Sequence, residues 1–162
     1  MKLTRNIVLA LMPFVFASCA SIQPVKITRN ASLDQYTYFF ITPTETKTSS
    51  SSVGYRFRNG IYLNPSNRST NPADLITSYL INKGLVRIPE IKEELSDKTM
   101  IINYGETGRR RINSGTSTAV TLQIISAKTS EVLCIVTGEG RGQTETDDIR
   151  IAINRCLEEL YK

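Results

Sequence analysis

TAVTLQIISAKTSEVLCIVTGEGRGQTETDDIRIAINRCLEEL, residues 118–160, is the stretch that decides the fold. Its beginning alternates apolar and polar residues, and a polar turn at 128–130 precedes a second apolar run at 131–137, which predicts two antiparallel strands. Thr144 and Asp147 can cap the helix that follows, whose apolar residues have amphipathic spacing: Ile149, Ala152, Ile153, Cys156, Leu157 and Leu160. The stretch therefore indicates a sheet covered by a helix.

The upstream sequence extends the same sheet. Residues 35–42 (QYTYFFIT) and 99–104 (TMIINY) are rich in β-branched and aromatic residues, so both are expected to be strands. Asn71-Pro72 starts a helix that Gly84 ends, and residues 85–88 return as a short strand. We expect an α+β two-layer sandwich, in which two helices lie on one face of an antiparallel or mixed sheet of about four to five strands.

An inserted hairpin is predicted within the polar and otherwise irregular segment 43–71. Asn59-Gly60 suits a type I′ turn, and this register would face Phe57 with Tyr62. Aromatic residues beside arginines are common in protein interfaces and in sites for stacked ligands or sugar polymers. In the simpler interpretation the aromatic side packs on the sheet and the arginines are solvated. The residues of this first candidate binding surface are Tyr55, Phe57, Tyr62, Arg56 and Arg58.

The N-terminus has the layout of a bacterial secretion signal. Lys2 and Arg5 precede an apolar run at residues 7–17, which is about half as long as the ~20 residues that cross a membrane. The order Phe16-Ala17-Ser18-Cys19 resembles the lipobox of bacterial lipoproteins. That resemblance implies cleavage before Cys19, attachment of diacylglycerol to its sulfur and acylation of the new amino terminus by a fatty chain such as palmitate. An ordinary secreted protein with an incidental cysteine is the alternative.

The lipobox interpretation divides the chain and places it. Residues 1–18 are expected to be the signal peptide, 19–32 a lipidated tether and 33–162 a single α+β domain. By resemblance to bacterial sorting rules, Ala20 after the cysteine favours the outer membrane, and residues 20–25 lack the acidic cluster that resembles a surface-export tag. We therefore expect the domain in the cell envelope, on the periplasmic face of the outer membrane.

Composition argues against several functional classes. The chain of 162 residues has 20 Lys and Arg against 15 Asp and Glu, and loss of Lys2 and Arg5 with the signal leaves 18 against 15, or +3. This charge is too small to indicate nucleic acid binding. Histidine is absent, which removes the commonest general base and the commonest neutral metal ligand. We expect no metal, no cofactor and no enzymatic activity.

Three segments carry a resemblance to a known group of proteins. They are NPADLITSYLINKGLVRIPE (71–90), TMIINYGETGRRR (99–111) and ISAKTSEVLCIVTGEGRGQTETDDIRIAINRCLEEL (125–160). In them the chain resembles uncharacterised periplasmic lipoproteins of Bacteroides-like bacteria, which form a domain of unknown function. The wider element order is similar to that of small α/β domains in curli-export and Tol-associated lipoproteins. The resemblance implies the fold and the compartment, and it implies no activity.

Arg109, Arg110 and Arg111 form a second candidate binding surface. Three guanidinium groups could hold phosphate or carboxylate, such as lipid headgroups or acidic cell-wall groups. Adjacent residues of a strand point to opposite faces, so at most two of the three share a side. The simpler interpretation is that all three are solvated or paired within the chain.

The glycines and cysteines near the C-terminus have structural interpretations. The run Gly138 to Gly142 superficially fits a dinucleotide-binding loop, but Gln143 stands where the third glycine of that pattern belongs. Glycines spaced by two in a strand are better explained by close packing of a helix. Cys134 and Cys156 are a candidate disulfide in an oxidising compartment, although both also fit apolar patterns as reduced core residues.

The functional expectation is a lipid-anchored, non-enzymatic binding or assembly module of the cell envelope. Its partners would be the membrane, through the anchor, and another envelope protein or a cell-wall polymer. The alternative is a hydrolase or transferase acting on envelope polymer with carboxylates that converge only in the fold, and a structural spacer is a third. No catalytic residue is assigned, because the adjacent acidic pairs indicate solvated faces and helix caps: Glu93-Glu94, Asp147-Asp148 and Glu158-Glu159.

Overall fold

The computed structural model describes residues 22–57, 60–112 and 115–162, with their side chains except at positions 51–66. The predicted signal peptide, Cys19 and Arg58 lie outside the described residues, and the statements made about them stay predictions. In the part of the chain that is described, no helix is long and apolar enough to cross a membrane.

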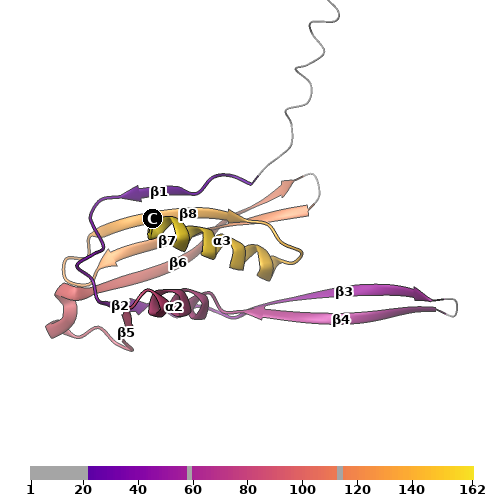
Figure 1. Cartoon of the computed structure of the whole chain (residues 1–162), viewed down its shortest axis with the longest axis horizontal. Helices are drawn as coiled ribbons and strands as arrows, with labels where there is room; N and C mark the ends of the chain where they lie inside the picture. The colour runs from indigo at the N-terminus through magenta and orange to yellow at the C-terminus, as the bar shows by residue number, and fades with distance from the viewer. Residues whose placement is uncertain (1–21, 58–59, 113–114) are drawn as a thin grey trace, which may run out of the picture.

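A mixed sheet of six strands forms the body of the molecule (Figure 1). Across the sheet the strands follow the order β1-β8-β7-β6-β2-β5. β2 pairs in parallel with both β5 and β6, and the other neighbours are antiparallel. The bounds are Lys26–Arg29 for β1, Tyr38–Ile41 for β2, Val86–Arg87 for β5, Thr99–Ile112 for β6, Gly115–Ser126 for β7 and Val132–Gly140 for β8.

The meander β6-β7-β8 confirms the strand pattern of the deciding stretch. β7 and β8 are antiparallel neighbours joined by a turn at residues 127–129. Along β7 the alternate residues Val120, Leu122 and Ile124 are fully buried, as the alternation of apolar and polar side chains predicts. The local periodicity was therefore sufficient to fix both the strands and the face that each residue takes.

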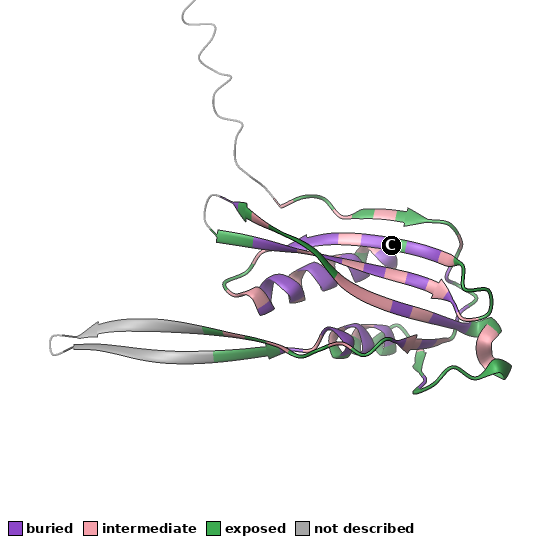
Figure 2. Ribbon diagram, turned by 180° about the vertical axis from the view of Figure 1, so that it is seen from behind, coloured by how far each residue is buried: buried purple, intermediate pink, exposed green. Residues whose placement is uncertain are grey.

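Two α-helices, α2 (Pro72–Asn82) and α3 (Glu145–Leu160), lie on one face of the sheet, and a short 3-10 helix, η2 (Glu93–Lys98), precedes β6. α3 packs against β7 and β8. Figure 2, seen from behind, has the strands in front of both helices. Phe39 of β2, Ile76 of α2 and Ile153 of α3 are fully buried in the layer between sheet and helices. The expected α+β class is confirmed.

Both helices begin at the capping residues that the sequence indicates. The Asn71 side chain accepts a hydrogen bond from the Ala73 N–H at 2.9 Å, and the Thr144 hydroxyl accepts one from the Asp147 N–H at 3.3 Å. Gly84, with a φ of +88°, follows the end of α2 in the left-handed conformation that glycine favours.

The sheet has more strands than the four to five expected, because β1 lies within residues 19–32, the segment predicted to be a tether. Among the described residues, the first strand is therefore β1 and not the one predicted at 35–42. β1 is short and mostly exposed, and it pairs at the sheet edge with β8, far away in sequence. The apolar alternation here consists of Val25 and Ile27 alone, which is too short to indicate a strand.

The expectation of an irregular segment at 43–71 was wrong. The hairpin expected within it is present, but Gly60 belongs to β4 and not to the turn, and residues 58 and 59 lie outside the described residues. β3 (Lys47–Phe57) and β4 (Gly60–Thr70) pair along their whole length as a second, two-stranded sheet. Tyr62 pairs with Tyr55 instead of Phe57, because Gly60 already belongs to β4 and pairs with Phe57. Serine and proline have low strand propensity, so the sequence did not reveal how far the pairing extends.

Candidate functional site

The β3–β4 hairpin projects from the body of the molecule (Figure 1). Each of its strands has 11 residues, which corresponds to a length of roughly 35 Å. Hydrogen bonding joins the two strands to each other and to no strand of the six-stranded sheet among the described residues. The register places Tyr55 opposite Tyr62 and Arg56 opposite Ile61, while the side chains at these positions are not among those described.

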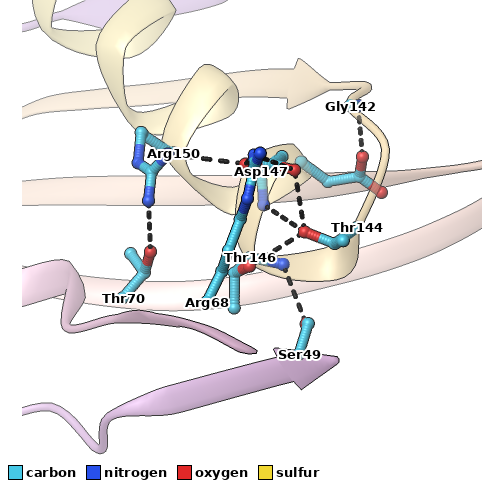
Figure 3. Close-up of polar contacts among 9 residues, drawn as sticks. Ser49, Arg68, Thr70, Gly142, Thr144, Thr146, Asp147 and Arg150 are labelled. Carbon is cyan, nitrogen blue, oxygen red and sulfur yellow. Dashed lines mark hydrogen bonds and ion pairs between the residues drawn. The ribbon is translucent and has the colours of Figure 1, made fainter. Parts of the chain in front are cut away.

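A polar junction fixes the base of the hairpin against the start of α3 (Figure 3). Arg68 of β4 donates to both carboxylate oxygens of Asp147, at 2.8 and 3.0 Å. Arg150, one helical turn further along, donates to the Thr70 hydroxyl at 3.1 Å. On the other strand, the Ser49 hydroxyl accepts the N–H of Thr146 at 3.2 Å. Lys47 of β3 also forms an ion pair with Glu106 of β6 at 3.2 Å. The direction in which the hairpin projects is thus set by contacts with the first turns of α3 and with β6.

Asp147 is the centre of this junction. It is only 7% exposed, and burial alone would raise the pKa of its carboxyl group. The hydrogen bond from the Thr144 hydroxyl and the charges of Arg68 and Arg150 outweigh burial, so the pKa is lowered. The N-terminal end of α3 also favours a carboxylate at this position. Asp147 is therefore ionised at neutral pH and holds both arginines.

A second polar cluster holds the N-terminal segment on the sheet. Glu139 of β8 is 7% exposed. Its carboxylate accepts two hydrogen bonds from the Arg110 guanidinium, at 3.1 and 2.9 Å. It also accepts one from the Ser117 hydroxyl and one from the Gln23 N–H at 2.8 Å. Arg155 of α3 donates to the carbonyl oxygens of Glu139 and Gln23. The bond from Arg110 is the main reason that the pKa of Glu139 is lowered to about 2, against the opposing effect of burial. Gln23 is thus held through both its N–H and its carbonyl.

Next to this cluster lies an open cavity of about 370 Å³. Its lining combines the segment before β1 with the far ends of β6 and β8, and it includes the charged residues Lys26, Arg109, Arg110 and Glu139. The register pairs Arg109 with Thr118, Arg110 with Ser117 and Arg111 with Thr116, so Arg110 points away from its two neighbours. Arg109 forms an ion pair with Glu145 at 3.1 Å, while Arg110 binds Glu139. The three arginines therefore do not share one face, as the alternation predicts.

The glycines of β8 let α3 approach the sheet, as the sequence analysis predicts. A Cβ at Gly140 would lie 1.9 Å from the carbonyl oxygen of Asp148, and a Cβ at Gly138 would lie 2.7 Å from the sulfur of Cys156. These distances are shorter than real carbon contacts allow. The Gly138–Gly142 run therefore has a packing function.

Cys134 and Cys156 are free and fully buried, so the candidate disulfide is not formed. The sulfur of Cys156 lies over Gly138, which is four residues from Cys134 along the same strand. Four extended residues span about 13 Å, whereas the Cα atoms of a disulfide lie ~4–7 Å apart. Both thiols are therefore reduced side chains of the core.

Asp148 differs from the solvated cap that its sequence pattern indicates. It is 2% exposed, and its carboxylate accepts the N–H of Gly142. Burial raises the pKa of Asp148, although the Gly142 N–H and the charge of Arg109 oppose this change. Asp148 and Glu145 both line a cavity of about 500 Å³ at the start of α3. Among the described residues, no group of three or more acidic or cysteine side chains could hold a metal ion.

Sequence reasoning did not identify Glu139, Asp148 or Arg68 as structurally important. The signal for Glu139 was present, because a carboxylate between two glycines interrupts an otherwise apolar strand. Arg68 had no such signal, since its partner Asp147 lies in a different element and far away in sequence.

These features define a class of protein: a two-layer α+β domain with a projecting hairpin and no metal cluster in the described residues. No family model matches the chain, and no curated protein matches it. Among solved structures, the fold is similar to that of a point variant of the PelC dodecamer from Paraburkholderia phytofirmans, with a TM-score of 0.50 and 13% identity over 85% of this chain and 98% of that one. The PelC dodecamer of the same organism in another crystal form has a TM-score of 0.44 at 13% identity, covering 85% of this chain and 96% of that one. The first likeness concerns the fold alone.

Proposed function

We propose that the chain is a lipid-anchored protein of the bacterial cell envelope that acts as a non-enzymatic binding or assembly module, with the hairpin as its contact surface. The observation that carries this proposal is the position of β3 and β4, which pair with each other over 11 residues and whose described side chains contact the body near the base of the hairpin. An isolated two-stranded hairpin in water is marginally stable. A hairpin of this length is therefore best explained by a partner that covers it.

The hairpin offers two means of recognition. Each strand has an outer edge whose backbone N–H and C=O groups are not paired with another strand in the described chain. Such edges accept an added strand from a partner. In addition, residues 53–64, which form the outer half of the hairpin, are rich in aromatic and aliphatic residues, and such residues suit protein interfaces and sugar polymers. A second copy of this chain belongs among the partners to be tested, since the solved PelC structure with this fold is a dodecamer.

Crosslinking in cells tests the proposal directly. A photoreactive amino acid at Phe57 or Tyr62 of the full chain should capture a defined protein, another copy of the chain or cell-wall polymer. The matched control is the same amino acid at Glu90, which is exposed on the body. Capture of nothing but lipid from the hairpin positions, or identical products from Glu90, would count against the hairpin as a contact surface.

The anchor is tested separately through Cys19. Mass spectrometry of the mature protein should find an N-terminal cysteine that carries a diacylglycerol and a further acyl chain. Cys19→Ser should remove the protein from the washed membrane fraction, while Ala20→Ser is the matched control and should leave it there. Unchanged fractionation of Cys19→Ser would refute the anchor and leave the hairpin proposal standing.

One observation favours the enzymatic alternative. Asp148, with its raised pKa, and Glu145 line the same cavity, and an acid with a raised pKa beside a second carboxylate is typical of glycoside hydrolysis. Both groups nevertheless have partners, since Asp148 accepts the Gly142 N–H and Glu145 pairs with Arg109. Release of soluble fragments from purified cell-wall polymer, abolished by Asp148→Asn and by Glu145→Gln, would favour the enzyme over the binding module.

A further inference from the structure

The N-terminal segment joins the body at a fixed point. Gln23 is only four positions after Cys19, and its backbone is held by the Glu139 carboxylate at 2.8 Å and the Arg155 guanidinium at 2.9 Å. Four residues reach at most about 14 Å. If Cys19 carries acyl chains, as the proposed function assumes, this point of the body must lie within that distance of the membrane surface.

The surface around Gln23 is rich in positive charge. We call it the anchor-side surface and define it by Gln23 and the cations Lys26, Arg109, Arg110, Arg111 and Arg155. It includes both faces of this end of the sheet, since Arg110 lies on the opposite face from Arg109 and Arg111. The side chains of Lys26, Arg109, Arg110 and Arg111 are at least partly exposed at the ends of β1 and β6. All of them except Arg111 line the cavity of about 370 Å³, and Arg111 lies next to it in the sequence. Arg155 reaches the same place from α3, through its bond to Gln23. Two of these cations are paired, Arg110 with Glu139 and Arg109 with Glu145, and the charge of Arg109 also acts on Asp148, so five cations stand beside these three acids.

The opposite corner of the body has no such excess of positive charge, since its acids are nearly balanced by Lys92, Lys98 and Lys128, the last of which pairs with Asp97 at 2.5 Å. The segment from Glu90 to Asp97, between β5 and β6, contains four acids against one lysine, Lys92. In Figure 1 the chain enters β1 on the side of the molecule where β6 ends and β7 begins, whereas β5 lies at the other edge of the sheet. The body is therefore polarised, with positive charge at the end where the anchor is attached.

We propose that the anchor-side surface docks on the anionic headgroups of the bilayer that holds the acyl chains of Cys19. The short connection brings the surface to the bilayer. The bonds from Glu139 and Arg155 to the backbone of Gln23, which we call the clamp, prevent free rotation of the body. The cations then bind phosphate groups. The segment from Glu90 to Asp97, at the opposite corner of the body, then lies further from the membrane than Gln23 and β1.

Fluorescence quenching in vesicles tests this orientation with the full lipidated protein. Thr28→Cys on β1 and Glu90→Cys at the opposite corner provide labelling sites for an environment-sensitive dye, since both positions are exposed and Cys134 and Cys156 are buried. Phosphatidylcholine vesicles with and without phosphatidylglycerol would carry a quencher on some headgroups. We expect several-fold stronger quenching at residue 28 than at residue 90 when phosphatidylglycerol is present. Equal quenching at the two positions would overturn the proposal.

A matched pair of charge reversals tests the role of the cations. Lys26→Glu changes an exposed lysine of the anchor-side surface, and Lys92→Glu changes an exposed lysine at the opposite corner. Lys26→Glu should lower the quenching at residue 28 by at least about threefold in vesicles with phosphatidylglycerol and have little effect without it, whereas Lys92→Glu should change neither. Equal effects of the two reversals would contradict docking through headgroups.

The outcomes separate docking from the anchor itself. Mass spectrometry of the same preparation reports whether Cys19 is acylated. If the protein is unacylated and does not bind vesicles, both the proposed anchor and the proposed docking are refuted. An acylated protein that binds vesicles but shows equal quenching at residues 28 and 90 refutes the docking alone.

Discussion

Arg68 of β4 lies 2.8 Å from the carboxylate of Asp147 in the first turn of α3, so one ion pair connects the projecting hairpin to the helix that covers the sheet. The Asp147 side chain is 10% exposed and also contacts Arg150, whereas the Arg68 side chain is 45% exposed. A pair of this kind contributes little to the stability of the body, because solvent screens the arginine. Its consequence is geometric, since it fixes the angle at which β3 and β4 leave the domain.

Arg68→Ala should therefore loosen the hairpin without unfolding the domain. We expect the distance between spin labels at Phe57 and at the exposed Asn154 of α3 to become more broadly distributed, while the free energy of unfolding falls by only about 0.5 kcal/mol. Pulsed electron paramagnetic resonance measures the distribution, and Arg87→Ala on the exposed edge strand β5 is the control. An unchanged distribution would show that the other contacts at its base, those of Ser49, Thr70 and Lys47, fix the hairpin without Arg68.

Gly140→Ala should destabilise the protein severely. The new Cβ would lie 1.9 Å from the carbonyl oxygen of Asp148 and 2.5 Å from the N of Ala152, so α3 would have to move off the sheet at a cost of about 3 kcal/mol or more. Urea denaturation measures the loss. Gly105→Ala in β6 is the control, since no atom lies within 4 Å of its Cβ and the change should stay within about 1 kcal/mol. Similar midpoints for the two variants would show that the helix does not approach the strand this closely.

The parts of the fold that the sequence predicts are those with local signals. α3 and the β7–β8 pair follow from periodicity, and Asn71 marks the start of α2, because capping and amphipathic spacing involve residues close together in the chain. β1 and most of the hairpin could not be predicted this way. Lys26 pairs with Thr137 across most of the chain, and the serines of β3 become strand residues only because β4 lies beside them.

In the candidate site too, the sequence predicts the local features but not the contacts between distant residues. Alternation along β6 correctly separated Arg110 from Arg109 and Arg111, since the faces of a strand are a local property. The partners of these side chains were not predictable, because the contact between Arg110 and Glu139 depends on β6 and β8 lying on either side of β7. Asp148 looked like a solvated cap for a related reason: the chain that buries it includes Thr118 of β7, which is distant in sequence.

Glu139→Gln should destabilise the protein more at neutral pH than in acid. The pKa of Glu139 in the fold is about 2, below its ordinary value of 4.5, so its ionised form contributes stability above about pH 4.5 that is lost as the pH falls toward 2. We expect a loss of about 2 kcal/mol at pH 7, because two charge-assisted bonds from Arg110 weaken, and a smaller difference from the natural protein at about pH 3. Urea denaturation at both pH values measures this, with Glu94→Gln on the exposed surface as control.

The same variant should also release the N-terminal segment. Loss of the carboxylate weakens the bond to the Gln23 N–H, so hydrogen exchange at that amide should accelerate while the amides of β7 are little affected. An equal loss of stability at pH 7 and pH 3, or unchanged exchange at Gln23, would contradict the clamp.

Cys134 and Cys156 should stay reduced and unreactive in the folded protein, even under oxidising conditions. Burial raises the pKa of both thiols, to about 12 for Cys156, and the thiolate is the form that reacts. We therefore expect iodoacetamide at about pH 8 to modify neither residue until urea unfolds the chain, whereas an added cysteine in Thr28→Cys should be modified in the native state. Mass spectrometry without reductant should also find both thiol hydrogens, because the position of Cys156 over Gly138 leaves Cys134 too far along the strand for a bridge. A disulfide in the native protein, or rapid modification of Cys156, would mean that α3 does not occupy its place above the glycines of β8.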